Sequence, residues 1–412
     1  MDFEDSPEEA AFRAEARAWL DANAPLRAGR APSDPLDERA DQSARDKARA
    51  WQKLKADKGY ARITWPKGMG GIGGTPMQSI IFAQEEAKYD VPSGAAFAIG
   101  LGMCIPTLMA YCSDEVKARY VKPAVEGAEI WCQLFSEPAG GSDVAALRTR
   151  AERQGDDWIV NGSKIWTTGA QFSDYGLLLA RTDPNAPKHK GLTMFFLSMK
   201  SPGVEVRPIK QASGASGFNE IFFTDVKIAD SQRVGEVGQG WQVALTTLMH
   251  ERLAVGGGQG GGIDVAQLLG LARTLELEDG PAIKNAAVRE KIADWYVRSA
   301  GLKYTTLRTM TALSRGQQPG PEASIAKIVV ASKLQDLCGF AMELEGEAGA
   351  AMGEDAPLHG LFQMGWLSAP GLRIAGGTDE ILRNIIAERV LGLPQDVRVD
   401  KDVPFNKVPT GR

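Results

Sequence analysis

The sequence WIVNGSKIWTTG, residues 158–169, lies where the hydrophobic pattern of this chain of 412 residues changes from helical to strand-like. Its Asn161-Gly162 pair stands between two arms of alternating apolar residues, a pattern that predicts a β-hairpin. The segments YGLLLART, LTMFFLSM, GVEVRPI and EIFFTDVKI follow it, and each is strand-like and bounded by glycine, proline or aspartate. We therefore predict a β region that extends from about residue 131 to residue 235.

Helical periodicity flanks this β region on both sides. Near the start, Phe12, Ala16, Trp19 and Leu20 form one apolar stripe, and beyond residue 236 WQVALTTLMHERLAV and VREKIADWYVRSAGLKYTTLRTMTALSRG also read as helices. Helices, then strands, then helices predict an α+β fold rather than a doubly wound sheet. The expected parts are an N-terminal helical domain (1–130), a middle antiparallel β domain (131–235), a C-terminal helical bundle (236–395) and a loose tail (396–412).

Composition excludes several classes of function. The net charge is −5 and the basic residues are dispersed, so neither nucleic acid nor an anionic membrane is an expected partner. No apolar stretch approaches the roughly 20 residues of a membrane span, and the acidic N-terminus is no signal peptide. We therefore expect a cytoplasmic enzyme. The four cysteines and three histidines have no metal-ligand spacing, so no metal site is predicted.

Two glycine-rich stretches, residues 68–73 and 256–261, match the dinucleotide-binding pattern G-x-G-x-x-G by letter. That site requires a hydrophobic strand before the glycines and a helix after them, inside a βαβ unit. The first stretch follows Trp65-Pro66-Lys67, which reads as a turn, and the second lies in a helical region. Both are better explained as loops or close-packing segments, so we reject a nicotinamide site.

The region from residue 131 to residue 182 resembles the acyl-CoA dehydrogenase flavoprotein family. Its first motif is Ser136-Glu137-Pro138 with Gly141-Ser142-Asp143, and its second is the run from Asn161 to Thr168. The segments EIFFTDVKIADSQRVGEVGQGW (220–241) and GGTDEILRNIIAERVLG (376–392), with Glu251-Arg252 between them, resemble the family in the same order. The resemblance implies an FAD enzyme of lipid or fatty-acid catabolism, such as β-oxidation, that dehydrogenates acyl-CoA.

The resemblance also implies a set of binding residues. Those for the cofactor are Gln133, Phe135, Ser136, Trp166, Thr168, Gly377, Thr378 and Glu380, and those for the CoA part of the substrate are Ser142 and Arg252. The residue types suit these roles because a flavin ring needs an aromatic platform and hydrogen bonds. Thr378 is a suitable N-cap for the last long helix, and a glycine-led helix start suits a phosphate.

The catalytic base is the unusual feature of this sequence. In most of the family a glutamate at the position of Gly376 removes the α-proton, so here that position offers only a backbone N–H to the thioester carbonyl. The isovaleryl- and long-chain-specific members instead place the glutamate where this chain has Glu251. Ala244, Leu248 and Glu251 share one helical stripe with Val255, so burial is expected to raise the pKa of Glu251. A structural salt bridge is the alternative role for Glu251.

Three features of the sequence concern subunit assembly and selectivity for the acyl chain. An Arg-x-x-Phe-Gly-like element is missing, and the family's Gln-x-x-Gly-Gly stretch is replaced by residues 343–347, Glu-Leu-Glu-Gly-Glu. The inter-subunit part of the FAD site must therefore differ; a homodimer or homotetramer is expected, with a heteromer left open. The glycine cluster at 256–262 either leaves room for a bulky acyl group or permits close helix packing.

Three functions remain open at this level. The first is a dehydrogenase that passes electrons to electron-transferring flavoprotein. The second is an acyl-CoA oxidase or another flavin oxidase or hydroxylase of the same fold, and the third is a catalytically silent subunit of a heteromer. Anaerobic bleaching of the flavin by acyl-CoA, and peroxide formation in air, would separate the three.

Overall fold

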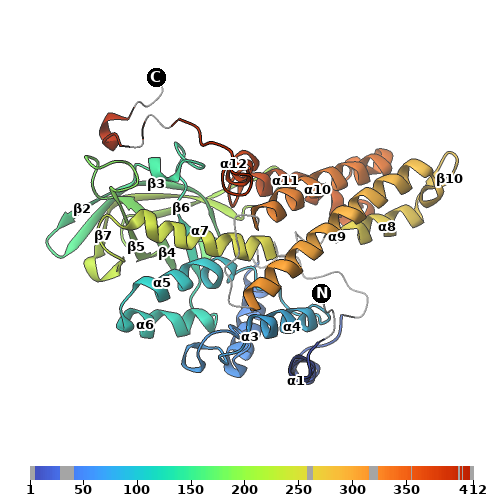
Figure 1. The fold of residues 1–412 in the computed structure, drawn as a ribbon, viewed down its shortest axis with the longest axis horizontal. Coiled ribbons are helices and arrows are strands. Elements are labelled where there is room, and N and C mark those ends of the chain that lie inside the picture. Colours follow the sequence, from blue (N-terminus) through green and yellow to red (C-terminus); the bar gives the residue numbers. More distant parts are fainter. Residues whose placement is uncertain are drawn as a thin grey trace. The chain divides into compact units, whose positions relative to one another are not determined.

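The structure is a computed structural model that describes residues 5–27, 41–257, 263–314, 323–353, 355–397, 400 and 402–408. The chain forms two compact units (Figure 1). The N-terminal unit comprises residues 1–251 together with 396–412, and the C-terminal unit comprises residues 252–395. The expected order of helices, strands and helices is confirmed.

The N-terminal unit begins with short amphipathic helices. They are α1 (Pro7–Asn23), α3 (Gln42–Lys58), α4 (Pro76–Glu86), α5 (Ile105–Tyr111) and α6 (Asp114–Val125). Ser6 caps α1 in a reciprocal capping box with Glu9, and Pro7 occupies the first turn, where a missing N–H costs nothing. The predicted stripe packs inward: Phe12, Ala16 and Leu20 are buried.

The strands of the N-terminal unit form one mixed sheet. They are β1 (Trp131–Leu134), β2 (Arg150–Gln154), β3 (Asp157–Thr168), β4 (Tyr175–Arg181), β5 (Leu192–Ser198), β6 (Val204–Ile209), β7 (Phe218–Ala229) and β8 (Arg233–Val234). Their order is β6-β7-β3-β2-β4-β5-β8, with β1 beside β4. The predicted antiparallel pairing holds for most neighbours, but β4 pairs in parallel with both β1 and β2, which makes the sheet mixed.

The predicted hairpin at Asn161-Gly162 is wrong. β3 continues through both residues, and the turn of the β2–β3 hairpin lies earlier, where Gln154 pairs with Asp157 across Gly155 and residue 156. Asn161-Gly162 instead forms an irregularity in the pairing of β3 with β7. The Asn161 side-chain amide donates to Asp225 Oδ1 at 2.9 Å, and Asn161 Oδ1 accepts from the Asp225 N–H at 3.0 Å. An Asn-Gly pair suits a bulge as well as a turn, because both need unusual backbone angles.

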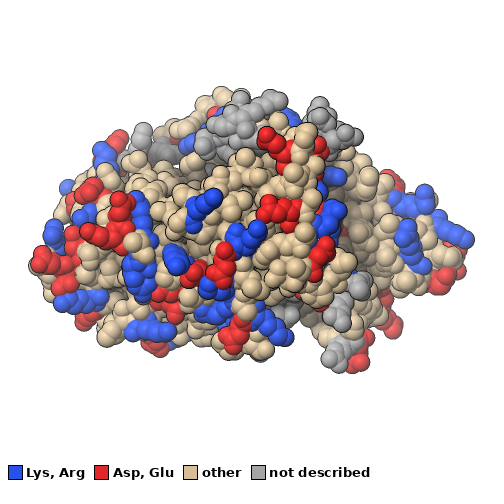
Figure 2. Space-filling view, turned by 90° about the horizontal axis from the view of Figure 1, so that it is seen from below, with Lys and Arg blue, Asp and Glu red and all other residues tan. Residues whose placement is uncertain are grey.

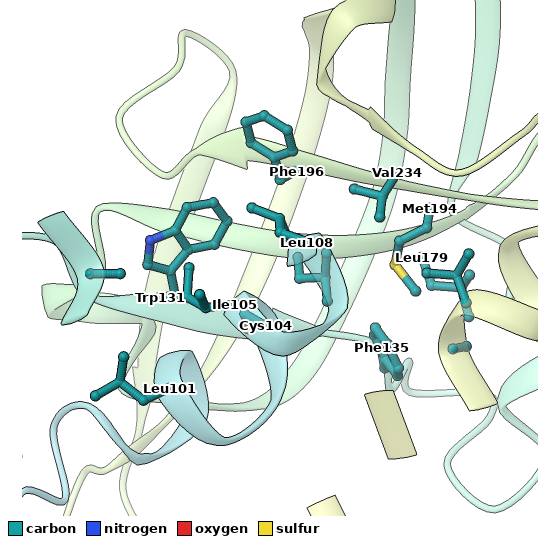
Figure 3. Packing of buried hydrophobic residues seen from close by; sticks show 14 of the residues in the cluster. Leu101, Cys104, Ile105, Leu108, Trp131, Phe135, Leu179, Met194, Phe196 and Val234 are labelled. Atoms are coloured by element: carbon teal, nitrogen blue, oxygen red, sulfur yellow. The ribbon is translucent and has the colours of Figure 1, made fainter. Parts of the chain in front are cut away.

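Both faces of the sheet are covered by apolar side chains. One face packs on the N-terminal helices in a cluster that includes Leu101, Ile105 and Leu108 from the helices and Phe135 and Phe196 from the β region (Figure 3). A second cluster, with Trp158, Phe195 and Phe223, lies on the other face. A sheet buried on both faces is a rigid support for the loops at its edges.

Helix α7 (Gly240–Gly257) follows the sheet. Val243 and Ala244 belong to the first apolar cluster, and Leu248 packs against it. Thr247 contacts Thr107 across a 2.9 Å hydroxyl pair, which ties α7 to α5. The predicted buried stripe of α7 is therefore confirmed at Ala244, and Leu248 is partly buried on it.

The C-terminal unit is helical. Its elements are α8 (Val265–Thr274), the short strands β9 (Glu276–Leu277) and β10 (Gly280–Pro281), α9 (Ala286–Ser314), α10 (Ala323–Leu344), α11 (Leu361–Ile374) and α12 (Asp379–Arg389). A core that includes Leu268, Trp295, Leu337 and Phe362 joins α8 to α11. Within the described residues, no helix has the length and apolar character needed to cross a bilayer.

Residues 402–408, near the C-terminus, pack onto the N-terminal unit, whereas the sequence had suggested a loose tail. Residues Phe405–Lys407 form a short 3-10 helix, and Pro404 pairs with Pro187 in an isolated bridge.

Acidic and basic side chains are interspersed over the face that Figure 2 shows, so neither sign dominates there.

Candidate functional site

The turn after β1 is fixed by a buried ion pair. Lys164 Nζ donates to Glu137 Oε1 at 2.8 Å and to the Phe135 carbonyl at 3.0 Å, and the Lys164 side chain is fully buried. Glu137 also accepts the backbone N–H groups of Arg148 and Thr149 at 2.6 and 2.9 Å. One carboxylate therefore holds together the segment around Phe135, the strand β3 and the start of β2.

Burial and the attraction between the two charges together set the pKa values of this pair. Burial alone would raise the pKa of Glu137, but the adjacent Lys164 ammonium holds it below its usual value. Burial lowers the pKa of Lys164 to about 8, against the opposing effect of Glu137. Both groups are charged near neutral pH, and each also makes hydrogen bonds to the backbone, which helps a buried ion pair to persist.

Trp166 is held in an unusual conformation two residues beyond Lys164. Its φ is 60°, in the left-handed region that bulky residues rarely adopt, and the pairing of β3 with β7 shifts register between Lys164 and Thr167. The bulge turns the indole outward, so 55% of Trp166 is exposed although it belongs to a central strand. Phe218 packs edge-on against it with ring centroids 6.1 Å apart.

The residues expected at the flavin ring lie close together in this frame. The Ile165 N–H donates to the Ser136 carbonyl at 2.9 Å. Because Ile165 directly precedes Trp166 in the chain, this hydrogen bond places Ser136 next to the strand that carries Trp166. Phe135 is buried, whereas Gln133, Ser136 and Thr168 are half-buried. An exposed aromatic face beside a braced main-chain turn fits a planar heterocycle, and strain of this kind concentrates at binding sites.

Ser142 lies on the loop that follows this turn. It is exposed, and its neighbour Asp143 forms an ion pair with Lys188 at 2.8 Å. The loop then enters the 3-10 turn Val144–Ala146 and returns to β2 at Thr149, which Glu137 binds. The position expected to touch CoA is therefore accessible and lies on a loop anchored at both ends.

The C-terminal unit holds the second group of expected cofactor residues. Gly376 and Gly377 have φ of 68° and 96°, which glycine adopts without strain, and they form the turn between α11 and α12. Thr378 caps α12 as predicted, because its Oγ1 accepts the Ile381 N–H at 3.2 Å. The pKa of the exposed Glu380 is lowered, first by a hydrogen bond from its own backbone N–H and then by Thr378.

Lys327 of α10 braces this turn. Its Nζ donates to the Gly377 carbonyl at 2.6 Å and to the Arg373 carbonyl at 3.0 Å. Asp379 is 2% exposed and accepts from Arg373 Nε at 2.7 Å. The end of α11, the glycine turn and the first turn of α12 are therefore fixed by one lysine and one ion pair.

The proposed base lies where side chains are not described. α7 continues through Glu251 and Arg252 to Gly257, but the side chains of residues 251–262 lie outside the described part of the chain. The roles of Glu251 and Arg252 therefore stay predictions. Most of the glycine cluster also falls outside the described residues, and the choice between a wide pocket and close packing stays open there.

The segment that replaces the family's Gln-x-x-Gly-Gly stretch is acidic and partly buried. Glu345 is 8% exposed and its Oε2 accepts from Gln363 Nε2 at 2.8 Å, while burial raises its pKa. Glu343 is exposed and lines a groove of about 500 Å³ among α9, α10 and α11, which basic side chains of α9 and α11 also line. Carboxylates at these positions disfavour an anionic diphosphate.

Two positioning lysines escaped the sequence analysis. Lys164 was quoted within a motif without a role, and Lys327 was not singled out. Lys164 does carry a signal, because it occupies an inward position of an alternating strand, where a lysine is costly unless it is paired. Lys327 offers no comparable signal. Among the described residues, no group of His, Cys, Asp and Glu is arranged to hold a metal ion.

Comparisons with known proteins match the chain along most of its length. Three family models match in order: acyl-CoA dehydrogenase N-terminal domain at residues 6–128, middle domain at 132–226 and C-terminal domain at 238–391. The acyl-CoA dehydrogenase IpdE1 of Mycobacterium tuberculosis is 34% identical over 394 residues, which cover 94% of this chain and 98% of that protein.

Two further relatives extend this similarity. The acyl-CoA dehydrogenase FadE34 of Mycobacterium tuberculosis is 35% identical over 342 residues, which cover 82% of this chain but only 45% of FadE34. A solved structure described as the Tcur3481-Tcur3483 steroid ACAD superposes with a TM-score of 0.78 and 26% identity. That match covers 96% of this chain and 100% of the solved chain.

Proposed function

The chain belongs to the acyl-CoA dehydrogenase family, and we propose from this premise that it is an FAD-dependent acyl-CoA dehydrogenase. The family is flavin-dependent. The proposed reaction is α,β-dehydrogenation of a CoA thioester to the 2-enoyl-CoA. The observation that supports the proposal most is Trp166, which faces outward in a strained backbone conformation. It lies beside the Phe135–Ser136 turn, which Lys164 holds in place. These positions match the family's flavin contacts.

The residues present suit FAD in both units. Trp166 offers an aromatic face, and Gln133 of β1, Phe135 and Ser136 of the turn after β1, and Thr168 of β3 add main-chain and side-chain hydrogen-bonding groups. Gly377, Thr378 and Glu380 form the glycine-led start of α12, which suits a phosphate or a cofactor hydroxyl. The chemistry that FAD would supply at these residues is an acceptor for the hydride that leaves the substrate's β-carbon.

The remaining chemistry falls to residues of the chain. We propose that the Glu251 carboxylate removes the proton from the α-carbon, because no carboxylate stands at Gly376. The Gly376 N–H donates to the thioester carbonyl and stabilises the negative charge that develops there as the α-proton leaves. Ser142 and Arg252 bind the CoA part of the substrate. Lys327 keeps the Gly376-Gly377 turn in place for this role.

For the substrate, we propose a bulky acyl group that carries rings or branches. The matched Tcur3481-Tcur3483 structure is described as a steroid enzyme, and its identity of 26% extends over almost the whole chain. The glycine-rich sequence that follows Glu251 is consistent with a wide acyl site. The electron acceptor that we propose is electron-transferring flavoprotein.

A role within a heteromer is a second candidate, favoured by one observation. Glu343, Glu345 and Glu347 occupy the stretch that contributes to the inter-subunit FAD site in many family members, and Glu343 is exposed. Negative charge there weakens binding of a diphosphate. The number of FAD molecules per chain, measured from the flavin absorbance of purified protein, distinguishes a homo-oligomer with one FAD per chain from an assembly with fewer.

The direct test is an anaerobic reaction with a panel of acyl-CoA thioesters. The purified protein should be yellow, and straight, branched and ring-bearing acyl-CoAs should bleach its flavin at different rates, fastest for ring-bearing ones. The same reaction in air should form little peroxide without another acceptor. A protein that binds FAD but is bleached by no acyl-CoA would overturn the proposal, and rapid peroxide formation would assign an oxidase.

A further inference from the structure

The C-terminal segment is joined to one loop of the sheet by two backbone hydrogen bonds. The Phe405 N–H donates to the Ala186 carbonyl at 2.9 Å, and the Asn406 N–H donates to the Pro184 carbonyl at 3.0 Å. Ala186 and Pro184 belong to the loop between β4 and β5, residues 182–191. We call the C-terminal residues 400 and 402–408 the strap. Backbone pairing gives the strap a fixed register on this loop.

Arg181, at the end of β4, lies beneath the strap. Its guanidinium is buried and donates to three carbonyls, those of Ala145 at 2.6 Å, Leu147 at 3.1 Å and Lys188 at 3.2 Å. The ring of Phe405 covers the guanidinium, with its centroid 3.5 Å from Cζ. Because a desolvated cation–π contact is strong, Phe405 stabilises the arginine in its buried position.

Arg181 thereby connects the strap to the loop that carries Ser142. Ala145 and Leu147, two of its three acceptors, follow Ser142 and Asp143 directly in the chain. Loss of the Phe405 ring would expose the guanidinium to water, which competes with the carbonyls for its N–H groups. The conformation of residues 141–147 therefore depends on a residue more than 250 positions away in the sequence.

Lys188 makes a second connection between the same segments. Its Nζ pairs with Asp143 at 2.8 Å and with Asp400 of the strap, and the lysine is 8% exposed. Asp143 is half-exposed, whereas the Asp400 side chain is 27% exposed. Two carboxylates from distant parts of the chain thus share one mostly buried ammonium, and Asp143 is the residue next to Ser142.

We propose that the strap is a structural part of the CoA-binding site: through Arg181 and Lys188, Phe405 and Asp400 position the Ser142 loop. The ligand that this loop would take is the CoA portion of the thioester, so this inference rests on the proposed function. Phe405 and Asp400 are positioning residues, because they act on the loop and touch no reacting atom. A loop fixed before binding loses less conformational entropy when the ligand binds.

Two substitutions in the strap test this proposal, each with a matched control. Phe405→Ala removes the ring, and Phe405→Leu keeps apolar volume without a π face. Asp400→Asn removes the charge that pairs with Lys188, and Asp402→Asn removes a charge from an exposed strap residue. Each variant is made in the full-length, FAD-loaded protein. FAD content and thermal stability are measured first to confirm folding.

The first readout is amide hydrogen exchange over residues 141–149, without any CoA ligand. Phe405→Ala and Asp400→Asn should speed exchange there, Phe405→Leu should have an intermediate effect, and Asp402→Asn should match the parent. Parent-like exchange over residues 141–149 in folded Phe405→Ala and Asp400→Asn overturns the proposal. This readout needs no acyl-CoA turnover and is therefore independent of the proposed function.

The second readout is binding of free coenzyme A by calorimetry, followed by kinetics with whichever acyl-CoA the parent oxidises. Phe405→Ala should weaken binding and raise KM roughly tenfold, as expected for loss of a buried cation–π contact, with kcat within about twofold. Faster exchange with unchanged coenzyme A binding overturns the positioning role. If the parent itself binds no coenzyme A, the proposed function fails instead, and CoA is excluded as the ligand of this loop.

Discussion

The Lys164 ammonium lies 2.8 Å from the Glu137 carboxylate in the interior of the N-terminal unit, with the two side chains 0% and 6% exposed. This contact joins strand β3, which carries Trp166, to the turn that carries Phe135 and Ser136. A charged pair in such a position is expensive to bury and is not needed to fill the core, since apolar residues fill it at least as well. We infer that it fixes the geometry of the turn.

Lys164→Met should destabilise the protein strongly, by about 3–5 kcal/mol, because the buried Glu137 carboxylate loses its cation. Lys164→Met combined with Glu137→Gln should be less destabilised than the sum of the single variants, since the glutamine still accepts hydrogen bonds and carries no charge. Urea unfolding of the four proteins measures the coupling energy. Additive effects within about 0.5 kcal/mol would show that the two side chains act independently.

Trp166→Gly should separate the stability of the apoprotein from flavin binding. Glycine adopts the positive φ without strain, which stabilises the folded protein by about 1–2 kcal/mol. Glycine also makes the unfolded chain more flexible, which destabilises the folded protein by about 0.5–1 kcal/mol. The two effects oppose each other, so the stability of the apoprotein should change little. FAD binding should weaken by about tenfold, or ~1.4 kcal/mol, through loss of the aromatic face. Fluorescence titration of apoprotein with FAD measures this affinity.

Trp166→Phe serves as the control, because it keeps an aromatic ring and the strained backbone. It should bind FAD more tightly than Trp166→Gly. If Trp166→Gly instead clearly destabilises a still folded apoprotein and leaves its FAD affinity at the parent level, the indole is a packing residue rather than a flavin contact.

Lys327→Met should loosen the glycine turn before α12. Lys327 donates to the Gly377 and Arg373 carbonyls, whereas Lys333, one and a half turns further along α10, binds Asp264 and Ser299 instead. The two lysines are almost equally buried, at 8% and 7% exposure. Lys333→Met is therefore a matched control, with a similar loss of stability and an intact Gly376 turn.

Stopped-flow bleaching of the flavin by a reactive acyl-CoA compares the two variants. Lys327→Met should slow bleaching far more than Lys333→Met does, because only the former displaces the Gly376 N–H. Equal rates in the two variants at equal stability would remove Gly376 from the proposed mechanism.

Glu85 predicts a specific response to acid. Its fully buried carboxylate pairs with Arg13 and Arg17 of α1 and with Lys88. Burial opposes ionisation, but hydrogen bonds from Arg17, Lys88 and Arg13 prevail and lower the pKa of Glu85 from 4.5 to about 2. A folded-state pKa below the unfolded value stabilises the protein above about pH 4.5, and this stabilisation is lost as the pH falls toward 2.

Glu85→Gln should therefore lower the free energy of unfolding by about 1–3 kcal/mol at pH 7. The difference in this free energy between the variant and the parent should become smaller below pH 4.5. Denaturant unfolding at pH 7 and pH 3.5 measures the gap at each pH, with the exposed Glu115→Gln as control. A gap that stays constant between these pH values would contradict the assigned ionisation of Glu85.

Local signals in the sequence predicted much of this fold. Thr378 caps α12 as predicted because an N-cap depends on a few neighbouring residues. Asn161-Gly162 led to a wrong prediction because the same dipeptide occurs in hairpin turns and in bulges. Which of the two forms depends on whether β7 pairs with β3 at these residues. A single sequence contains no direct record of that pairing.

Long-range contacts were the part that sequence could not predict. Phe405 packs on Arg181 and Asp400 pairs with Lys188, but nothing near the C-terminus indicates either partner. The mixed charge and two prolines of residues 397–412 instead suggested a loose tail. The bracing of the Gly377 turn by Lys327 is likewise set by how α10 packs beside α11 and α12.

The central claim is that Glu251 is the base, and one variant tests it most directly. Glu251→Gln keeps the size of the side chain and removes its basicity, so the protein should fold and bind FAD as the parent does. Under anaerobic conditions, bleaching of its flavin by a reactive acyl-CoA should slow by about 10²–10⁴-fold, the range that general acid–base catalysis supplies. Bleaching within a few-fold of the parent rate would contradict the account and require another base.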